Sequence, residues 1–202
     1  MELRAFKQRW PGWYPDVPPI GHLMRERHPE AWLRIHSLPD SKRYPDTKDE
    51  WAELLVRQNA VATAALGASS SCLLVSARFA EPREQMPELL ADSRLASSKA
   101  LLTYAPRLVD GGWPGEQAAG PRSAGIRGGF YAAAVDWRSG AHDELLRAVA
   151  SDEERFVIAD CSSGRVYAPY DGGADLFFPD APGRRAARET FRSWLSPLAS
   201  GL

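Results

Sequence analysis

Four aspartates lie in or beside the last run of short predicted strands, and they are the residues most suited to metal chemistry. They are Asp160, Asp171, Asp175 and Asp180. Clustered carboxylates can hold a divalent cation that activates water. However, their spacing does not match a calcium-binding loop, and Asp before Gly-Gly is common in hairpin turns. We therefore expect no metal, and the alternative is a hydrolase or nuclease whose metal is held by Asp171 and Asp175, with Asp160 or His36 as a further ligand.

A second chemically active group lies in the loop LPDSKRYPDT (38–47), where two cations and a phenol stand between two prolines. Prolines restrict this loop, and a restricted loop loses less conformational entropy on binding. The other interpretation is a rigid surface connection in which Tyr44 packs on the following helix. The candidate binding residues from this loop and from the aspartate-containing hairpin are Ser41, Lys42, Arg43, Tyr44, Tyr170, Asp171 and Asp175.

No segment carries the signature of a zinc site, a nucleophilic serine, a phosphate-binding loop or a dinucleotide-binding loop. We therefore expect no cofactor and favour binding over catalysis. Aromatic and arginine side chains are the usual hot spots of protein interfaces, and Trp10, Trp13, Tyr14 and Trp113 accompany the loop 38–47. The leading prediction is a protein-interaction module, immunity-like or regulatory, whose partner is another protein, with self-association as an alternative.

Composition narrows the class of protein. The 202 residues fit one domain, 1–202, and carry a net charge of −1, which gives no general attraction to nucleic acid or to an anionic membrane. The segment MELRAFKQRW lacks the apolar stretch of a secretory signal, and no run approaches the roughly 18 apolar residues that cross a bilayer. The expectation is a cytoplasmic protein that contacts neither membrane nor nucleic acid.

The elements that must position these residues follow from periodicity. The clearest helix is 47–66, because Thr47 and Glu50 form a capping-box pattern before an apolar stripe and Gly67 follows it. Short alternating runs separated by Gly-containing turns predict a three-stranded antiparallel meander over 155–178. Further helices are expected at 20–27, 83–92, 141–151 and 181–198, further strands at 31–37, 71–79, 99–105 and 128–137, an ordered arm at 1–19, and a long Gly/Pro-rich loop at 106–125.

This order of elements predicts an α+β fold. The sheet is antiparallel or mixed, it ends in the C-terminal meander, and the helices pack mainly on one face.

Two segments together resemble an uncharacterised bacterial family, a domain of unknown function. The resemblance rests on RIHSLPDSKRYPDTKDEWAELLVRQNAV (34–61) and GRVYAPYDGGADLFFP (164–179), followed by a helix that ends at Trp194 and Leu195. The SLPxSKRY loop and the PYDGGxD hairpin are its distinctive motifs. The resemblance implies a small cytoplasmic bacterial protein in a genomic context of immunity or stress proteins, and it implies no reaction.

Overall fold

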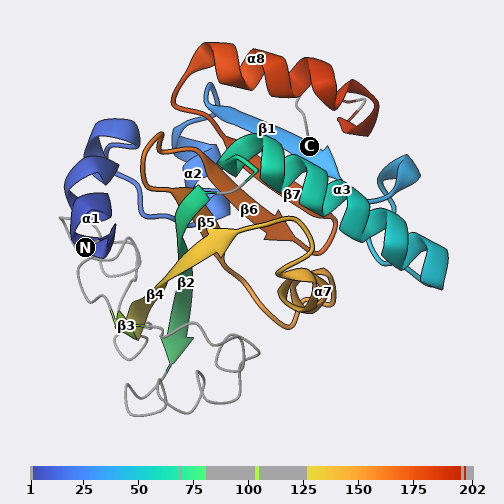
Figure 1. Ribbon diagram of the computed structural model, residues 1–202, viewed down its shortest axis with the longest axis horizontal. Coiled ribbons are helices and arrows are strands. Elements are labelled where there is room, and N and C mark those ends of the chain that lie inside the picture. Colours follow the sequence, from blue (N-terminus) through green and yellow to red (C-terminus); the bar gives the residue numbers. More distant parts are fainter. Residues whose placement is uncertain (1, 69, 81–102, 105–126, 197, 199–202) are drawn as a thin grey trace, which may run out of the picture.

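The computed structural model describes residues 2–68, 70–80, 103–104, 127–196 and 198. Their strands form one antiparallel sheet in the order β1-β7-β6-β5-β2-β4-β3 (Figure 1). The strands are β1 (Trp32–His36), β2 (Ser70–Ala80), β3 (Thr103–Tyr104), β4 (Arg127–Trp137), β5 (Val157–Asp160), β6 (Val166–Tyr170) and β7 (Gly173–Phe177). The expected α+β class and the C-terminal meander, β5 to β7, are confirmed.

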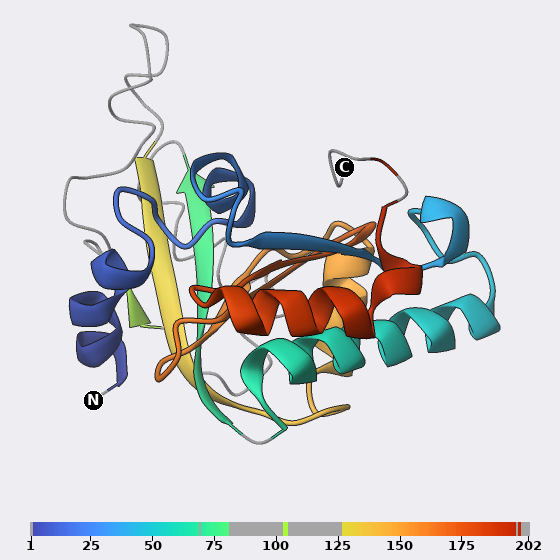
Figure 2. The same cartoon turned by 90° about the horizontal axis from the view of Figure 1, so that it is seen from above.

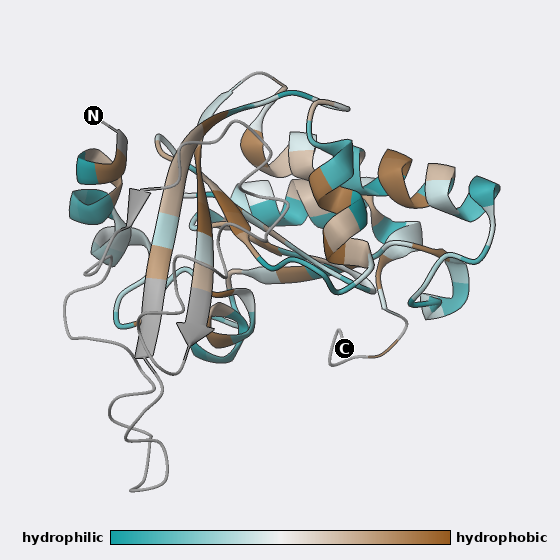
Figure 3. Cartoon of the chain, turned by 90° about the horizontal axis from the view of Figure 1, so that it is seen from below, coloured by the Kyte–Doolittle hydropathy of each residue, from teal (hydrophilic) through white to brown (hydrophobic). Residues whose placement is uncertain are grey.

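Helices cover both faces of this sheet. The helices α3 (Lys48–Leu66), α7 (Asp143–Ala150) and α8 (Ala181–Thr190) pack on one face, and α1 (Glu2–Trp13) and α2 (Gly21–Arg27) on the other. Figure 2 shows α2 across the sheet from α3 and α8. In Figure 3 the helices carry hydrophilic and hydrophobic residues side by side, as amphipathic helices must. None of the helices in the described ranges combines the length and apolar character needed to cross a membrane.

Helix α3 begins and ends where its sequence predicts. The Thr47 side chain accepts a hydrogen bond from the backbone of Glu50, whose side chain in turn accepts one from the backbone of Thr47, so both partners of the capping box are present. Gly67, with a φ of 97°, follows the last helical residue. A helix that begins at a fixed residue also fixes the end of the preceding loop 38–47.

A buried glutamine of α3 connects this helix to the sheet. The Gln58 amide donates to Ser37 Oγ at 2.8 Å and to the carbonyl of Gly173 at 2.9 Å, and its oxygen accepts from the Tyr167 hydroxyl. Gln58 is 3% exposed, so these bonds replace water that it has lost. Its contacts hold the end of β1 and the start of β7 against α3, beside both loops that the sequence selects.

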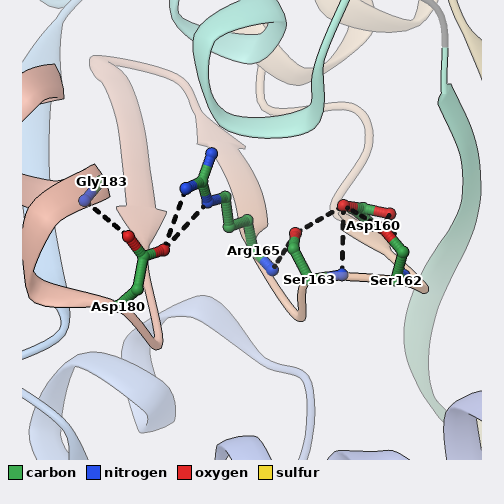
Figure 4. A network of polar contacts seen from close by, with 6 residues as sticks. All are labelled: Asp160, Ser162, Ser163, Arg165, Asp180 and Gly183. Atoms are coloured by element: carbon green, nitrogen blue, oxygen red, sulfur yellow. Dashed lines mark hydrogen bonds and ion pairs between the residues drawn. The ribbon is translucent and has the colours of Figure 1, made fainter.

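A second polar network holds the turn between β5 and β6 (Figure 4). Asp160 accepts hydrogen bonds from Ser162 and Ser163, while Arg165 pairs with Asp180, which caps α8 at the backbone of Gly183. These two aspartates therefore have structural roles, a turn and a helix cap.

The N-terminal segment is a helix rather than the expected arm. Phe6, Trp10 and Tyr14 are spaced by four residues and are all buried against the sheet. Adjacent rings lie 4.9 and 5.0 Å apart. Burying three aromatic side chains contributes roughly 1.5–3 kcal/mol each, which outweighs the cost of about 3 kcal/mol for Pro11 inside the helix.

The last helix is shorter than the expected 181–198. Helix α8 ends at Thr190, and a single 3-10 turn, Arg192–Trp194, follows it. Ala187 and Phe191 are buried, whereas Leu195 forms an isolated bridge with Ile35 and Leu198 is 62% exposed. Pairing with the edge strand β1 competes with continued helix at this point. The predicted helix 83–92, the loop 106–125 and most of the strand 99–105 lie outside the described residues.

The packing of α1 on the sheet can be tested at two glycines. A β-carbon at Gly164 would overlap the ring of Trp13, whereas one at Gly140 would meet nothing within 4 Å; both residues have positive φ. Each change to alanine should cost about 1–2 kcal/mol of unfolding free energy from backbone strain. Gly164→Ala should lose about 1–3 kcal/mol more, from overpacking. Urea denaturation measures both, and equal losses would contradict this packing of Trp13.

Candidate functional site

The carboxylate of Asp175 lies on the sheet face that α2 covers. Asp175 pairs with Arg34 of β1 on one side and with Ala168 of β6 on the other. Its Oδ1 accepts hydrogen bonds from Trp32 Nε1 at 2.8 Å and from Arg34 Nε at 2.9 Å. Its Oδ2 accepts one from Arg34 Nη2 at 3.2 Å and lies 3.5 Å from Arg25 Nη1 of α2. With a side chain only 6% exposed, this carboxylate depends on these donors.

Arg34 is held between two aromatic rings as well as by Asp175. Its guanidinium carbon lies 5.4 Å from the ring centre of Trp32 and 4.8 Å from that of Tyr170. Burial lowers the pKa of Arg34, but the hydrogen bond and charge of Asp175 outweigh it, and the pKa is raised. Burial raises the pKa of Tyr170 to about 12. Arg34 therefore stays charged and Tyr170 stays neutral near pH 7.

The second predicted aspartate contacts the loop 38–47. Asp171 Oδ2 accepts from Arg43 Nε at 2.6 Å and from the Tyr44 hydroxyl at 2.8 Å. We call Arg43, Tyr44 and Asp171 the clasp. Burial raises the pKa of Asp171, but hydrogen bonds from Arg43 and Tyr44 lower it more, so the pKa lies below its usual value. The hydrogen bond to Asp171, together with burial, raises the pKa of Tyr44.

The other two predicted loop residues are not part of the clasp. Lys42 Nζ contacts Glu50 Oε1 at 2.6 Å and Asp46 Oδ2 at 2.8 Å. The hydrogen bond from Lys42, with backbone donors, lowers the pKa of Glu50 to about 2. Ser41 is exposed, with a positive φ of 58°. Lys42 thus supports the start of α3, and Ser41 lies in the turn before the clasp.

A cleft of about 320 Å³ opens beside Asp175, between α2 and the segment 152–156. Its apolar walls are Ile20, Val75, Ala77, Phe156, Val157 and Ala168, and its polar end carries Arg25, Arg34, Tyr170, Asp171 and Asp175. The sheet contributes only alanine and valine side chains to these apolar walls. The backbone of α2 also approaches closely, since a β-carbon at Gly21 would lie 3.1 Å from that of Ala168. We call this space the cleft.

Three of the predicted residues, Tyr170, Asp171 and Asp175, thus line one cleft, and Arg43 and Tyr44 lie at Asp171. Sequence reasoning missed Arg25, Trp32 and Arg34 as site residues. The alternation of β1 was a usable signal, because it put Trp32 and Arg34 on the same face. Their function as partners of Asp175 depends on the register between β1 and β7.

The four aspartates do not converge on a common point for a cation. Asp160 and Asp180 belong to the network in Figure 4, and Asp171 and Asp175 are occupied by arginine and aromatic donors. Within the described ranges, no three His, Cys, Asp or Glu side chains are grouped so that they could hold a metal ion. The arrangement here is suited to binding through charge and aromatic contacts.

The buried pair Arg34–Asp175 should matter for stability. Arg34→Leu should lower the unfolding free energy by about 3 kcal/mol, because an uncompensated buried charge remains; the continued presence of Arg25 puts the loss at the low end of the usual range. Arg155→Leu is the matched control, since it breaks an exposed pair with Asp152 and should cost at most about 1 kcal/mol. Denaturant unfolding of the two variants measures both losses. A loss for Arg34→Leu no larger than that of the control would refute the role of this pair.

The clasp should weaken in acid. Because the folded-state pKa of Asp171 is lowered, its contribution is complete above the unfolded-state value of about 4 and is lost as pH falls through the folded-state pKa. The stability difference between the wild type and Asp171→Asn should therefore be largest near pH 7 and shrink below pH ~4. Urea unfolding of both proteins across this pH range measures the difference. The contributions of all other carboxyl groups cancel in it, because both proteins share them. A difference that does not change with pH would show that the carboxylate is not engaged.

Comparison with known proteins finds an uncharacterised family, as the resemblance implied. A family model described as a domain of unknown function, DUF3885, matches residues 20–199. The match covers both β1 with its following loop and the β6–β7 hairpin. No curated protein shows significant similarity to the chain. No solved structure does so either. The chain belongs to the DUF3885 family, whose defining domain is of unknown function.

Proposed function

We propose that this chain is a protein-interaction module, immunity-like or regulatory, that acts in the cytoplasm and contacts its partner through the clasp. The observation that carries the proposal is that Arg43 and Tyr44 are exposed to solvent and yet fixed in position. Arg43 is 63% exposed and Tyr44 46% exposed, yet both are held in place by Asp171, which is itself buried. Arginine and tyrosine are among the residues that dominate binding energies at interfaces.

The clasp is also preorganised. Its two exposed side chains already share one acceptor, the guanidinium of Arg43 lies 5.5 Å from the ring centre of Tyr44, and Ser37 and Gly172 join the two loops through a backbone hydrogen bond of 3.1 Å. A partner would therefore immobilise fewer free side chains on binding than it would on an unrestrained loop. Tyr44 is one of three large apolar side chains that are exposed in the described part of the chain.

The alternative function, a metal-dependent hydrolase or nuclease, gains no support from the geometry of Asp171 and Asp175. Both carboxylates already accept hydrogen bonds from cationic or aromatic donors, and a metal would have to displace these donors. We therefore keep the binding function alone.

A capture experiment tests the proposal. The full chain, immobilised, should retain a stoichiometric partner from a native extract of its own cells, and the double variant Arg43→Ala/Tyr44→Ala should lose it. Arg188→Ala is the matched control, because Arg188 is exposed on α8, a helix that contributes no residue to the clasp. Sedimentation of the purified chain at micromolar concentration tests self-association in parallel. Neither partner nor self-association, or a partner that the double variant retains, would refute the clasp as the binding surface.

A further inference from the structure

We propose that the cleft binds a small organic carboxylate with an apolar tail. The carboxylate is accepted by Arg25, with Arg34 beside it, and the tail lies on the small apolar residues of the sheet. This site is separate from the partner-binding clasp, and neither proposal depends on the other.

The charges at the polar end of the cleft favour an anionic ligand. Two guanidinium groups, Arg25 and Arg34, face the carboxylate of Asp175, and the charge of Asp171 at the same end is balanced by Arg43. Tyr170 adds no negative charge, because its hydroxyl stays protonated at neutral pH. One positive charge is therefore left over at this end, in surroundings where water is partly excluded and charge-assisted hydrogen bonds are strong.

Arg25 is the cation that is available to a ligand. Arg34 holds Asp175 through two nitrogen atoms, at 2.9 and 3.2 Å, whereas Arg25 approaches it with one nitrogen atom at 3.5 Å. Good N–H···O hydrogen bonds measure about 2.7–3.2 Å, so the contact of Arg25 is a weak one. Its side chain is 26% exposed, and a guanidinium group has five N–H donors in a planar fork that fits a carboxylate.

The acidic side chains of the cleft are already engaged, so they do not offer a matching site for a cation. Asp171 is held by Arg43 and Tyr44, Asp175 by Arg34 and Trp32, and Asp152 by Arg155 at 2.9 Å. Glu154 is 2% exposed and also has an interaction partner. An amine would have to compete with arginines for Asp152, Asp171 or Asp175. A ligand carboxylate, by contrast, can bind Arg25, whose contact with Asp175 is weak.

The apolar walls of the cleft indicate the kind of group that the ligand carries besides its carboxylate. Val75 and Val157, which pair across β2 and β5, line the cleft on the sheet together with Ala77, and Ile20 lines it at the start of α2. At about 320 Å³ the cleft lies at the small end of ligand pockets. A fully hydrated anion such as phosphate would gain nothing from these walls, while an aryl or branched alkyl group would bury its surface there. The class of ligand is therefore a small amphipathic carboxylic acid.

Titration of the purified, ¹⁵N-labelled full chain with 3-phenylpropionate tests this assignment. Trp32 is a built-in reporter, because its indole N–H donates to Asp175 at 2.8 Å, and the variant Trp32→Phe assigns its signal. We expect a saturable shift of that signal. The neutral amide 3-phenylpropanamide, acetate without the apolar tail, and inorganic phosphate should each bind at least about tenfold more weakly.

Two variants of the cleft complete the test. Arg25→Gln should weaken binding of 3-phenylpropionate by about tenfold or more, which is the usual loss for a charge-assisted hydrogen bond. Arg155→Gln, which removes an exposed cation from the same cleft, should change it less than about twofold. Circular dichroism checks that both variants are folded. The proposal is overturned by no saturation at concentrations on the order of 10 mM, by equal binding of the amide or of phosphate, or by unchanged binding to Arg25→Gln.

Discussion

The buried carboxylate of Asp175 is the constraint on which the arrangement of β1 and α2 around β7 depends. It is surrounded by three donor side chains from two elements: Trp32 and Arg34 on the neighbouring strand β1, and Arg25 on α2. A slip of one residue between β1 and β7 would turn Asp175 toward the opposite face, which is apolar and packed against α3. The requirement to satisfy this charge therefore specifies the register of β1 and the position of α2.

The same register creates the surroundings of the clasp and of the cleft. Once β1 lies along β7, its C-terminal end is next to the β6–β7 turn, so the loop 38–47 starts beside Asp171. On the other face, Gln58 secures the same strand ends from α3. The two faces thus differ in kind. One is an apolar core crossed by polar connections such as those of Gln58 and Asn59, and the other combines an aromatic helix, a buried ion pair and the cleft.

Much of the fold could be predicted because its signals are local. The capping box of α3, the Gly-containing turns of the meander and the alternation in β1 each depend on residues within a few positions of one another. The N-terminal helix was missed because the prolines of segment 1–19 suggested an arm, while the spacing of Phe6, Trp10 and Tyr14 only becomes decisive once a sheet exists to bury them. The last helix was overextended because the bridge between Leu195 and Ile35 joins segments 160 residues apart.

For the candidate site, the sequence by itself determined which side chains are available: the loop with Arg43 and Tyr44, and the hairpin with Tyr170, Asp171 and Asp175. Only the tertiary structure decided which of them act together. It put Lys42 with Glu50 instead of with the aspartates, and it brought Arg25 and Arg34 to Asp175. The physical reason is that turn and cap preferences act along the chain, whereas the pairing of a buried charge depends on strand register and on helix packing, which join residues up to 150 positions apart.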